Sequence, residues 1–145
     1  MLFQGAFSEL LYSPLQESKL PSQSFTISKP RSEVFQASLS ALQALGYQIK
    51  DQQPDHGRIE TAFKPMTSSG WRAFSGALSG YKGMSDAWIV EMSESDQATS
   101  ITLRIAVMGE FVIGKPTYEY GVSKSWVKQK TSELIQVIQR HLTTT

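Results

Sequence analysis

The feature of this sequence that most restricts its fold is an alternating segment at residues 99–108. Its large apolar side chains are separated by single residues that are small or polar: Ile101, Leu103, Ile105 and Val107. Successive side chains of a β-strand point to opposite faces of a sheet, so this spacing predicts a strand with one buried face. Such a strand belongs to a sheet that other elements must cover on one side.

A helix is predicted between Pro30 and Gly46 and provides part of that cover. Proline suits the first turn of a helix, where its missing N–H is not needed, and glycine accepts the left-handed conformation that ends one. The apolar residues between them recur at helical spacing: Val34, Phe35, Ala37, Leu39, Ala41, Leu42 and Leu45. We therefore expect Leu42 and Leu45 to hold this helix on the sheet.

Further alternating segments complete the predicted sheet. They lie at 25–27, at 47–50 and 58–64 on either side of a turn at 54–57, at 87–92, and within 111–120. A second helix is predicted from Ser123 or Ser125, either of which suits the N-cap, to about His141. The order of strand, helix, two strands, an insert, two or three strands and a helix predicts an α+β fold. Its antiparallel sheet has about five strands, with two helices packed on one face.

The chain is 145 residues long, which predicts a single domain. We expect an N-terminal arm at 1–24, where Pro14 and Pro21 interrupt any periodicity, and the folded domain at 25–142. A Gly- and Ser-rich insert at 65–86 is the least regular part of that domain.

Composition excludes several classes of function. The formal net charge is +1, so the chain as a whole is not a nucleic-acid-binding polycation. There is no Cys for a disulfide or a zinc–thiolate site, and no apolar segment approaches the roughly 18 to 20 residues of a membrane span. His56 lies in a sequence typical of a turn rather than of a metal or acid–base site. We therefore expect no catalytic residue, metal site, cofactor or nucleic-acid partner.

Apolar side chains within the insert follow a helical spacing. Trp71, Phe74, Leu78 and Tyr81 occupy positions i, i+3, i+7 and i+10, among four glycines. Glycine permits close approach of another backbone, and large aromatic side chains supply much of the contact energy at interfaces. We predict that these residues bind another protein or a second copy of the chain. The alternative is that they pack on the sheet edge as ordinary core.

Several segments resemble a known family. They are Phe25-Thr26-Ile27-Ser28-Lys29-Pro30, Glu33-Val34-Phe35, Leu45-Gly46-Tyr47 and Gly57-Arg58-Ile59-Glu60-Thr61. They look like the repeated domains of BamC, an outer-membrane assembly lipoprotein, and related lipoproteins of unassigned function. The likeness covers residues 25–64 by motif and 87–142 by the order of elements. It implies a helix-grip arrangement, with antiparallel strands around a closing helix, and no catalytic residue.

These observations predict a non-enzymatic accessory or protein-binding domain of the bacterial cell envelope. The periplasm or envelope is expected rather than the cytoplasm, with membrane association only through an anchor outside this sequence. The alternative is a small apolar ligand bound between the last helix and the sheet, in a pocket lined by Phe111, Tyr118 and Trp126. An open space there favours the ligand, whereas a filled core with an exposed apolar patch favours the accessory role.

Overall fold

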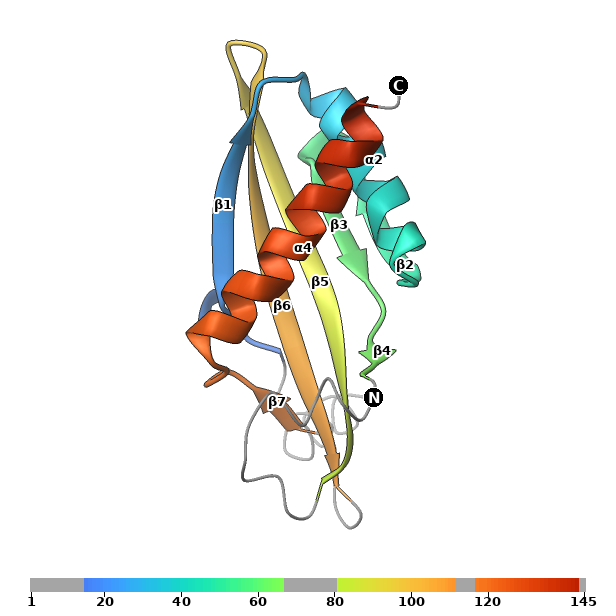
Figure 1. The fold of residues 1–145 in the computed structure, drawn as a ribbon, viewed down its shortest axis with the longest axis vertical. Helices are drawn as coiled ribbons and strands as arrows, with labels where there is room; N and C mark the ends of the chain where they lie inside the picture. Colours follow the sequence, from blue (N-terminus) through green and yellow to red (C-terminus); the bar gives the residue numbers. More distant parts are fainter. Residues whose placement is uncertain (1–14, 67–80, 112–116, 144–145) are drawn as a thin grey trace, which may run out of the picture.

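The computed structural model describes residues 15–66, 81–111 and 117–143 and has the predicted α+β architecture. Its elements in chain order are η1 (Glu17–Lys19), β1 (Ser22–Ile27), α2 (Arg31–Ala44), β2 (Ile49–Gln53), η2 (Pro54–His56), β3 (Arg58–Thr61), β4 (Lys64–Pro65), β5 (Tyr81–Ser95), β6 (Ala98–Phe111), β7 (Thr117–Glu119) and α4 (Lys124–Thr143). The seven strands described form one antiparallel sheet, and α2 and α4 cover the same face of it (Figure 1). The strands beyond the expected five are β4 and β7, short segments that pair with β5 and β6.

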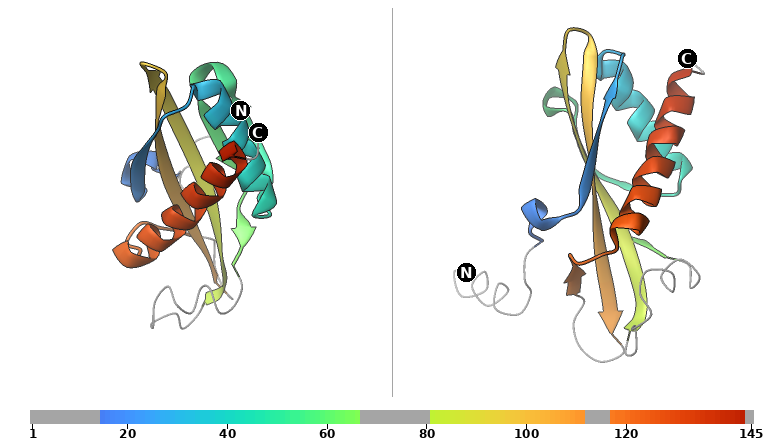
Figure 2. Two further views of the ribbon diagram at one scale, coloured as in Figure 1. Left: turned by 45° about the horizontal axis from the view of Figure 1, so that its top comes forward. Right: turned by 60° about the vertical axis from the view of Figure 1, so that its left-hand side comes forward.

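A long hairpin of β5 and β6 forms the centre of the sheet, whose strand order is β1-β6-β5-β3-β2 (Figure 2). Asp96 and Gln97 form its tip with φ angles of 54° and 63°, values typical of a tight hairpin turn. Both strands are longer than predicted. β5 begins at Tyr81, within the predicted insert, and β6 continues through Gly109 to Phe111. The two strands pair with each other from Tyr81–Phe111 to Ser95–Ala98. The backbone hydrogen bonds between them keep Gly83 and Gly109 in strand geometry.

The first strand begins inside the segment predicted to be an arm. β1 starts at Ser22 and pairs with residues 99–104 of β6. Leu20, just before it, is buried against the sheet. Ser22, Ser24 and Thr26 occupy the exposed positions of this edge strand. The alternation of apolar and polar residues that predicts a strand therefore begins only at Phe25.

The two helices begin and end as predicted. Gly46 takes a φ of 91° directly after α2, and the Tyr47 N–H then donates to the Leu42 carbonyl oxygen at 3.0 Å. This is the left-handed glycine that ends many helices. Leu42 is fully buried and Leu45 is half-buried against the core. At the start of α4, the Ser123 hydroxyl accepts a long hydrogen bond from the Trp126 N–H at 3.5 Å.

The predicted turn at 54–57 is also present. η2 ends at Gly57, which has a φ of 63°. A Cβ atom at this position would lie 2.4 Å from the carbonyl oxygen of Met92, so glycine is required for β3 to approach β5. His56 is exposed in this turn, in agreement with its predicted structural role.

Side chains fill the space between α4 and the sheet. Leu134 and Ile138 of α4 belong to one core with Trp88, Leu103 and Ile105 of the strands, and all five are fully buried. The described residues therefore leave no large apolar cavity there, only a small polar cleft at one end. Neither described helix is long and apolar enough to cross a membrane.

Candidate functional site

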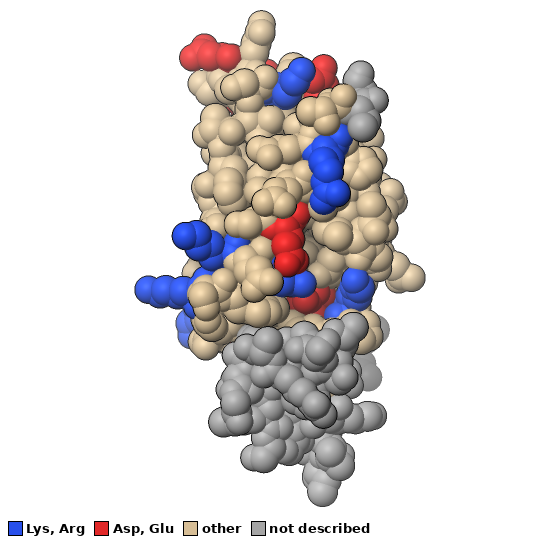
Figure 3. Space-filling view, viewed as in Figure 1, with Lys and Arg blue, Asp and Glu red and all other residues tan. Residues whose placement is uncertain are grey.

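A small cleft opens between α4, β4 and the first half of β5. Its volume is about 160 Å³, and its lining consists of Tyr47, Lys64, Pro65, Met66, Asp86, Trp126 and Lys130. An adjoining hollow of about 60 Å³ adds Leu45, Trp88, Glu133 and Leu134. We call these residues together the grip cleft. Figure 3 shows acidic and basic side chains meeting on the face that carries α4.

Four parts of the chain form the grip cleft. Tyr47 directly follows the glycine that ends α2, where the chain turns back toward the sheet. Lys64 of β4 is the register partner of Asp86 in β5. Asp86 shares the inner face of β5 with Trp88, because alternate residues of a strand point the same way. Lys130 lies on α4 above them.

Asp86 is a buried carboxyl, with a residue exposure of 3%. The Tyr47 hydroxyl donates a hydrogen bond to its Oδ1. Burial raises the pKa of Asp86, and the hydrogen bond from Tyr47 and the positive charges of Lys130 and Lys64 oppose this only in part. Burial and the charge of Asp86 also raise the pKa of Tyr47 far above its ordinary value. The Tyr47 hydroxyl therefore keeps its proton and remains a donor.

Two half-buried lysines border this pair. The Nζ of Lys64 donates to the Leu45 carbonyl oxygen at 2.6 Å and lies 5.0 Å from the centre of the Tyr47 ring. The Nζ of Lys130 lies 5.9 Å from the centre of the Trp126 ring. An ammonium group has three donors, so each lysine keeps N–H groups beyond these contacts.

Trp88 contributes a buried donor without an acceptor. Its residue exposure is 1%, and its indole Nε1 has no hydrogen-bond partner among the described residues. The indole is near enough to the Tyr47 hydroxyl to lower that pKa slightly, but it does not reach hydrogen-bond geometry. Burying an unpaired donor costs about 1–3 kcal/mol, so such groups usually have a partner. Trp88 lines the smaller hollow, where a bound molecule can accept this hydrogen bond.

The polar side chains of the grip cleft are mostly hydrogen-bond donors. Its donors are two ammonium groups, a phenol and an indole, and its lining contains no Ser, Thr, Cys or His nucleophile. Tyr47 holds its proton too tightly to act as a base near neutral pH. Within the described ranges, no group of three or more His, Asp or Glu residues is placed to hold a metal ion.

The ligand pocket predicted from the sequence is not assembled as expected. Trp126 does line the grip cleft. Tyr118 instead lies on the opposite face of the sheet, stacked on Phe63 with ring centres 6.0 Å apart. The register explains this, because Tyr118 of β7 pairs with Met108, whose side chain points away from α4. Phe111 ends β6, and its side chain is outside the described part of the chain.

The predicted partner-binding residues are mostly not described. Trp71, Phe74 and Leu78 lie outside the described ranges. Tyr81 is the first residue of β5 and pairs with Phe111 of β6, so this end of the predicted stripe is strand rather than helix. The prediction of partner binding by these residues stays a prediction.

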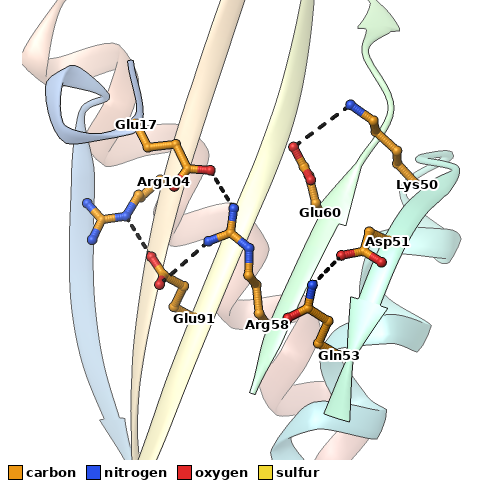
Figure 4. A network of polar contacts seen from close by, with 8 residues as sticks. All are labelled: Glu17, Lys50, Asp51, Gln53, Arg58, Glu60, Glu91 and Arg104. Atoms are coloured by element: carbon orange, nitrogen blue, oxygen red, sulfur yellow. Dashed lines mark hydrogen bonds and ion pairs between the residues drawn. The ribbon is translucent and has the colours of Figure 1, made fainter. Parts of the chain in front are cut away.

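The outer face of the sheet, away from the helices, carries a network of ion pairs (Figure 4). Arg58 of β3 pairs with Glu17 of η1, and with Glu91 of β5 at 3.6 Å. Glu91 also accepts a hydrogen bond from Nε of Arg104 at 3.0 Å. The network therefore ties η1, β3, β5 and β6 together across the strands.

An apolar groove of about 360 Å³ lies beside this network on the same face. We call it the outer groove, and it is lined by Leu15, Lys50, Glu60, Thr61, Ala62, Phe63, Ala87, Ile89, Ala106 and Tyr118. Phe63 lies here, although its spacing from Ile59 and Thr61 predicts the inner face. The strand is interrupted between β3 and β4, and this irregularity reverses the side on which Phe63 lies.

Sequence reasoning missed Asp86, Tyr47, Lys64 and Trp88 as a group. One signal was present: Asp86 lies two residues before Trp88, at an inner position of a largely apolar strand. A charged residue at such a position requires a partner inside the protein. The partner, Tyr47, is 39 residues away in sequence and could be identified only from the fold.

Comparison with known proteins gives structural likenesses only. No family model matches the chain, and no curated protein does either. TTHA0849 from Thermus thermophilus has a TM-score of 0.43 and 10% identity over 85% of this chain and 96% of its own. Ara h 8.0201 has a TM-score of 0.41 and 12% identity over 86% and 97%. A DUF4468 family protein from Bacteroides ovatus has a TM-score of 0.42 and 11% identity over 92% and 87%.

None of these three names mentions BamC or an envelope lipoprotein. The chain itself has the α+β, helix-grip-like architecture that the predicted resemblance implies, with an antiparallel sheet packed against a long closing helix.

Proposed function

We propose that this chain is a non-enzymatic binding domain and that the grip cleft is its site for a small polar molecule. The observation that carries the proposal is the buried indole N–H of Trp88, which has no acceptor among the described residues and lines a cleft open to solvent. An acceptor supplied by a ligand satisfies this donor when the site is occupied.

Size and polarity limit what the cleft can hold. A water molecule takes about 30 Å³ of liquid volume, so the main cleft of about 160 Å³ has room for a molecule of a few non-hydrogen atoms. Buried side chains fill the described space beneath α4, so the cleft favours a small polar ligand over the small apolar ligand predicted from the sequence. The ligand we propose is therefore small and polar.

The test is a ligand screen by NMR spectroscopy. The indole N–H resonance of Trp88 is assigned by its loss in Trp88→Phe, and small carboxylates, amines and amides are titrated into the parent protein. We expect at least one compound class to shift this resonance saturably at millimolar concentrations. If none of the three classes shifts it, or if the shift is linear and never saturates, the proposal is wrong.

A role in the cell envelope, with partner binding or self-association through residues 65–86, is a separate proposal that rests on the sequence pattern. Replacing Trp71 and Phe74 together with Ser should weaken self-association or partner binding and leave the melting temperature within a few degrees, because interface aromatics supply contact energy without supporting the fold. Sedimentation velocity and thermal unfolding measure the two effects. Unfolding of the double variant would show that these side chains belong to the core.

A further inference from the structure

We propose that the ligand of the grip cleft is a small monocarboxylate, held by the ammonium groups of Lys64 and Lys130 and by the indole N–H of Trp88. This inference rests on the proposed function and adds the chemical class of the ligand. It follows from three properties of the cleft: its surplus of donors, its charge and the apolar character of its remaining walls.

Donors outnumber acceptors in the grip cleft. Tyr47 already uses one oxygen of Asp86, and Leu45 accepts from Lys64. Neither Lys64 nor Lys130 forms an ion pair with a described carboxylate. The indole N–H of Trp88 has no hydrogen-bond acceptor among the described residues. A carboxylate supplies two acceptor oxygens with about four lone-pair sites, which matches several donors that converge on one small space.

The charges of the lining disfavour a ligand with more than one negative charge. The lining contains two ammonium groups, Lys64 and Lys130, and two carboxyl groups, Asp86 and Glu133. When Asp86 carries a proton, the ammonium groups exceed the single remaining carboxylate by one positive charge. A monoanion neutralises that excess, whereas a phosphate dianion leaves a negative charge beside the buried Asp86.

The remaining walls are apolar or aromatic. Trp126, Met66 and Pro65 line the main cleft, and Leu45 and Leu134 line the hollow. A short hydrocarbon chain on the carboxylate can lie against these surfaces, as is usual for sites in which a few polar groups fix the orientation of a ligand. Acetate and propionate are the simplest probes of this class.

Binding of a carboxylate is coupled to protonation of Asp86. The charged or titratable groups that face Asp86 are Tyr47 after α2, Lys64 of β4, and Lys130 and Glu133 of α4. A second negative charge in the same site favours the protonated form of Asp86, and a protonated Asp86 can donate to the bound anion. The affinity should therefore increase as the pH falls, and Asp86→Asn should remove this dependence.

The experiment compares acetate with acetamide, a neutral molecule of nearly the same shape, and with methylammonium, a cation. Each is titrated while the Trp88 indole resonance is followed. We expect acetate to bind at least about tenfold more tightly than acetamide, since hydrogen bonds to a charged group are stronger than those to a neutral one. In Lys130→Gln the acetate affinity should fall about tenfold. Lys128→Gln, an exposed lysine of α4 outside the cleft, should leave it unchanged.

The outcomes separate the ligand class from the proposed function. Binding of acetamide or methylammonium as tightly as acetate would overturn the carboxylate and keep the small-molecule site. No saturable binding by any of the three would overturn the carboxylate and weaken the site itself. An equal loss of affinity in Lys128→Gln and Lys130→Gln would show a general charge effect, and therefore no carboxylate site. Thermal unfolding of each variant confirms that it is folded before affinities are compared.

Discussion

The two faces of the β5–β6 hairpin are formed by alternate residues of the same strands, yet they hold charge in different ways. On the inner face, Asp86 is 3% exposed and its one described hydrogen bond comes from Tyr47. On the outer face, the Glu91 side chain is 42% exposed and lies between Arg58 and Arg104. Burial has removed water from the inner carboxyl, and its protein contacts replace that hydration only in part. The pKa of Asp86 is therefore raised.

The difference is the reason that we propose a ligand site on the inner face. A charged group that keeps its water and has two ionic partners has no unsatisfied interaction for a ligand to supply. An exposed ion pair of this kind contributes little to the free energy of folding. In the partly buried cleft beside α4, a carboxyl, two lysines and an unpaired indole interact more strongly with a bound molecule, because water screens them less than it screens exposed charges. We therefore expect the inner face to bind ligand and the outer network to align strands.

The largest expected effect concerns the apolar part of the inner face. Leu42→Ala should lower the free energy of unfolding by about 2–5 kcal/mol, because it leaves a cavity beneath α2. Leu42 is fully buried, whereas its neighbour Gln43 is exposed, so Gln43→Ala is the matched control and should stay within about 0.5 kcal/mol. Urea denaturation measures both. A loss below about 1 kcal/mol for Leu42→Ala would mean that this face is not the main core.

A smaller loss is expected when the buried carboxyl loses its donor. Tyr47→Phe removes the hydroxyl that bonds to Asp86 and should cost about 1–3 kcal/mol. Tyr118→Phe, on the outer face, is the matched control and should cost less than about 0.5 kcal/mol. Equal losses in the two variants would remove the contrast between the faces.

The third prediction concerns pH. Since burial raises the pKa of Asp86, the folded protein binds this proton more tightly than the unfolded chain does. The free energy of unfolding should therefore decrease as the pH rises from the ordinary carboxyl range, about 3.9, up to the raised pKa, and this contribution is constant above it. The Asp86→Asn variant has no carboxyl at this position, so its free energy of unfolding should not show this decrease.

The melting temperature of Asp86→Asn should thus rise relative to the parent protein across that pH interval. Asp55→Asn makes the same substitution at an exposed carboxyl in the turn at 54–57 and serves as the control. Thermal unfolding at a series of pH values measures both variants. A flat difference for Asp86→Asn would show that Asp86 is not protonated more easily in the folded state.

The smallest effect is expected on the outer face. Arg104→Gln breaks its contact with Glu91 and should cost only about 0.2–1 kcal/mol, less in high salt, because both side chains are partly exposed. Urea denaturation at low and high ionic strength gives both values. A cost above about 2 kcal/mol that salt does not reduce would make the outer network as important to the fold as the core.

The sequence was sufficient where local rules determine the structure. Alternation at 99–108 identified β6, and Gly46 identified the end of α2, because each depends on neighbouring residues alone. Sequence patterns were insufficient where the pairing register of the strands determines on which face of the sheet a side chain lies. Phe63 and Tyr118 both lie on the outer face, because of an interruption before β4 and a pairing with Met108 that no local pattern reveals. The contact between Asp86 and Tyr47 was also not predictable from the sequence, because it joins residues 39 positions apart.

The position of α4 in the chain also affects how the protein is made. This helix follows every described strand, and it covers the inner face that contains Trp88, Leu103 and Ile105. During synthesis from the N-terminus, the sheet can assemble before α4 leaves the ribosome, with these apolar side chains still exposed to water. We expect a chain released from the ribosome after Ser123, and therefore without α4, to be retained by chaperones and digested readily by protease. Protease resistance in this shorter chain would show that the sheet is stable without its closing helix.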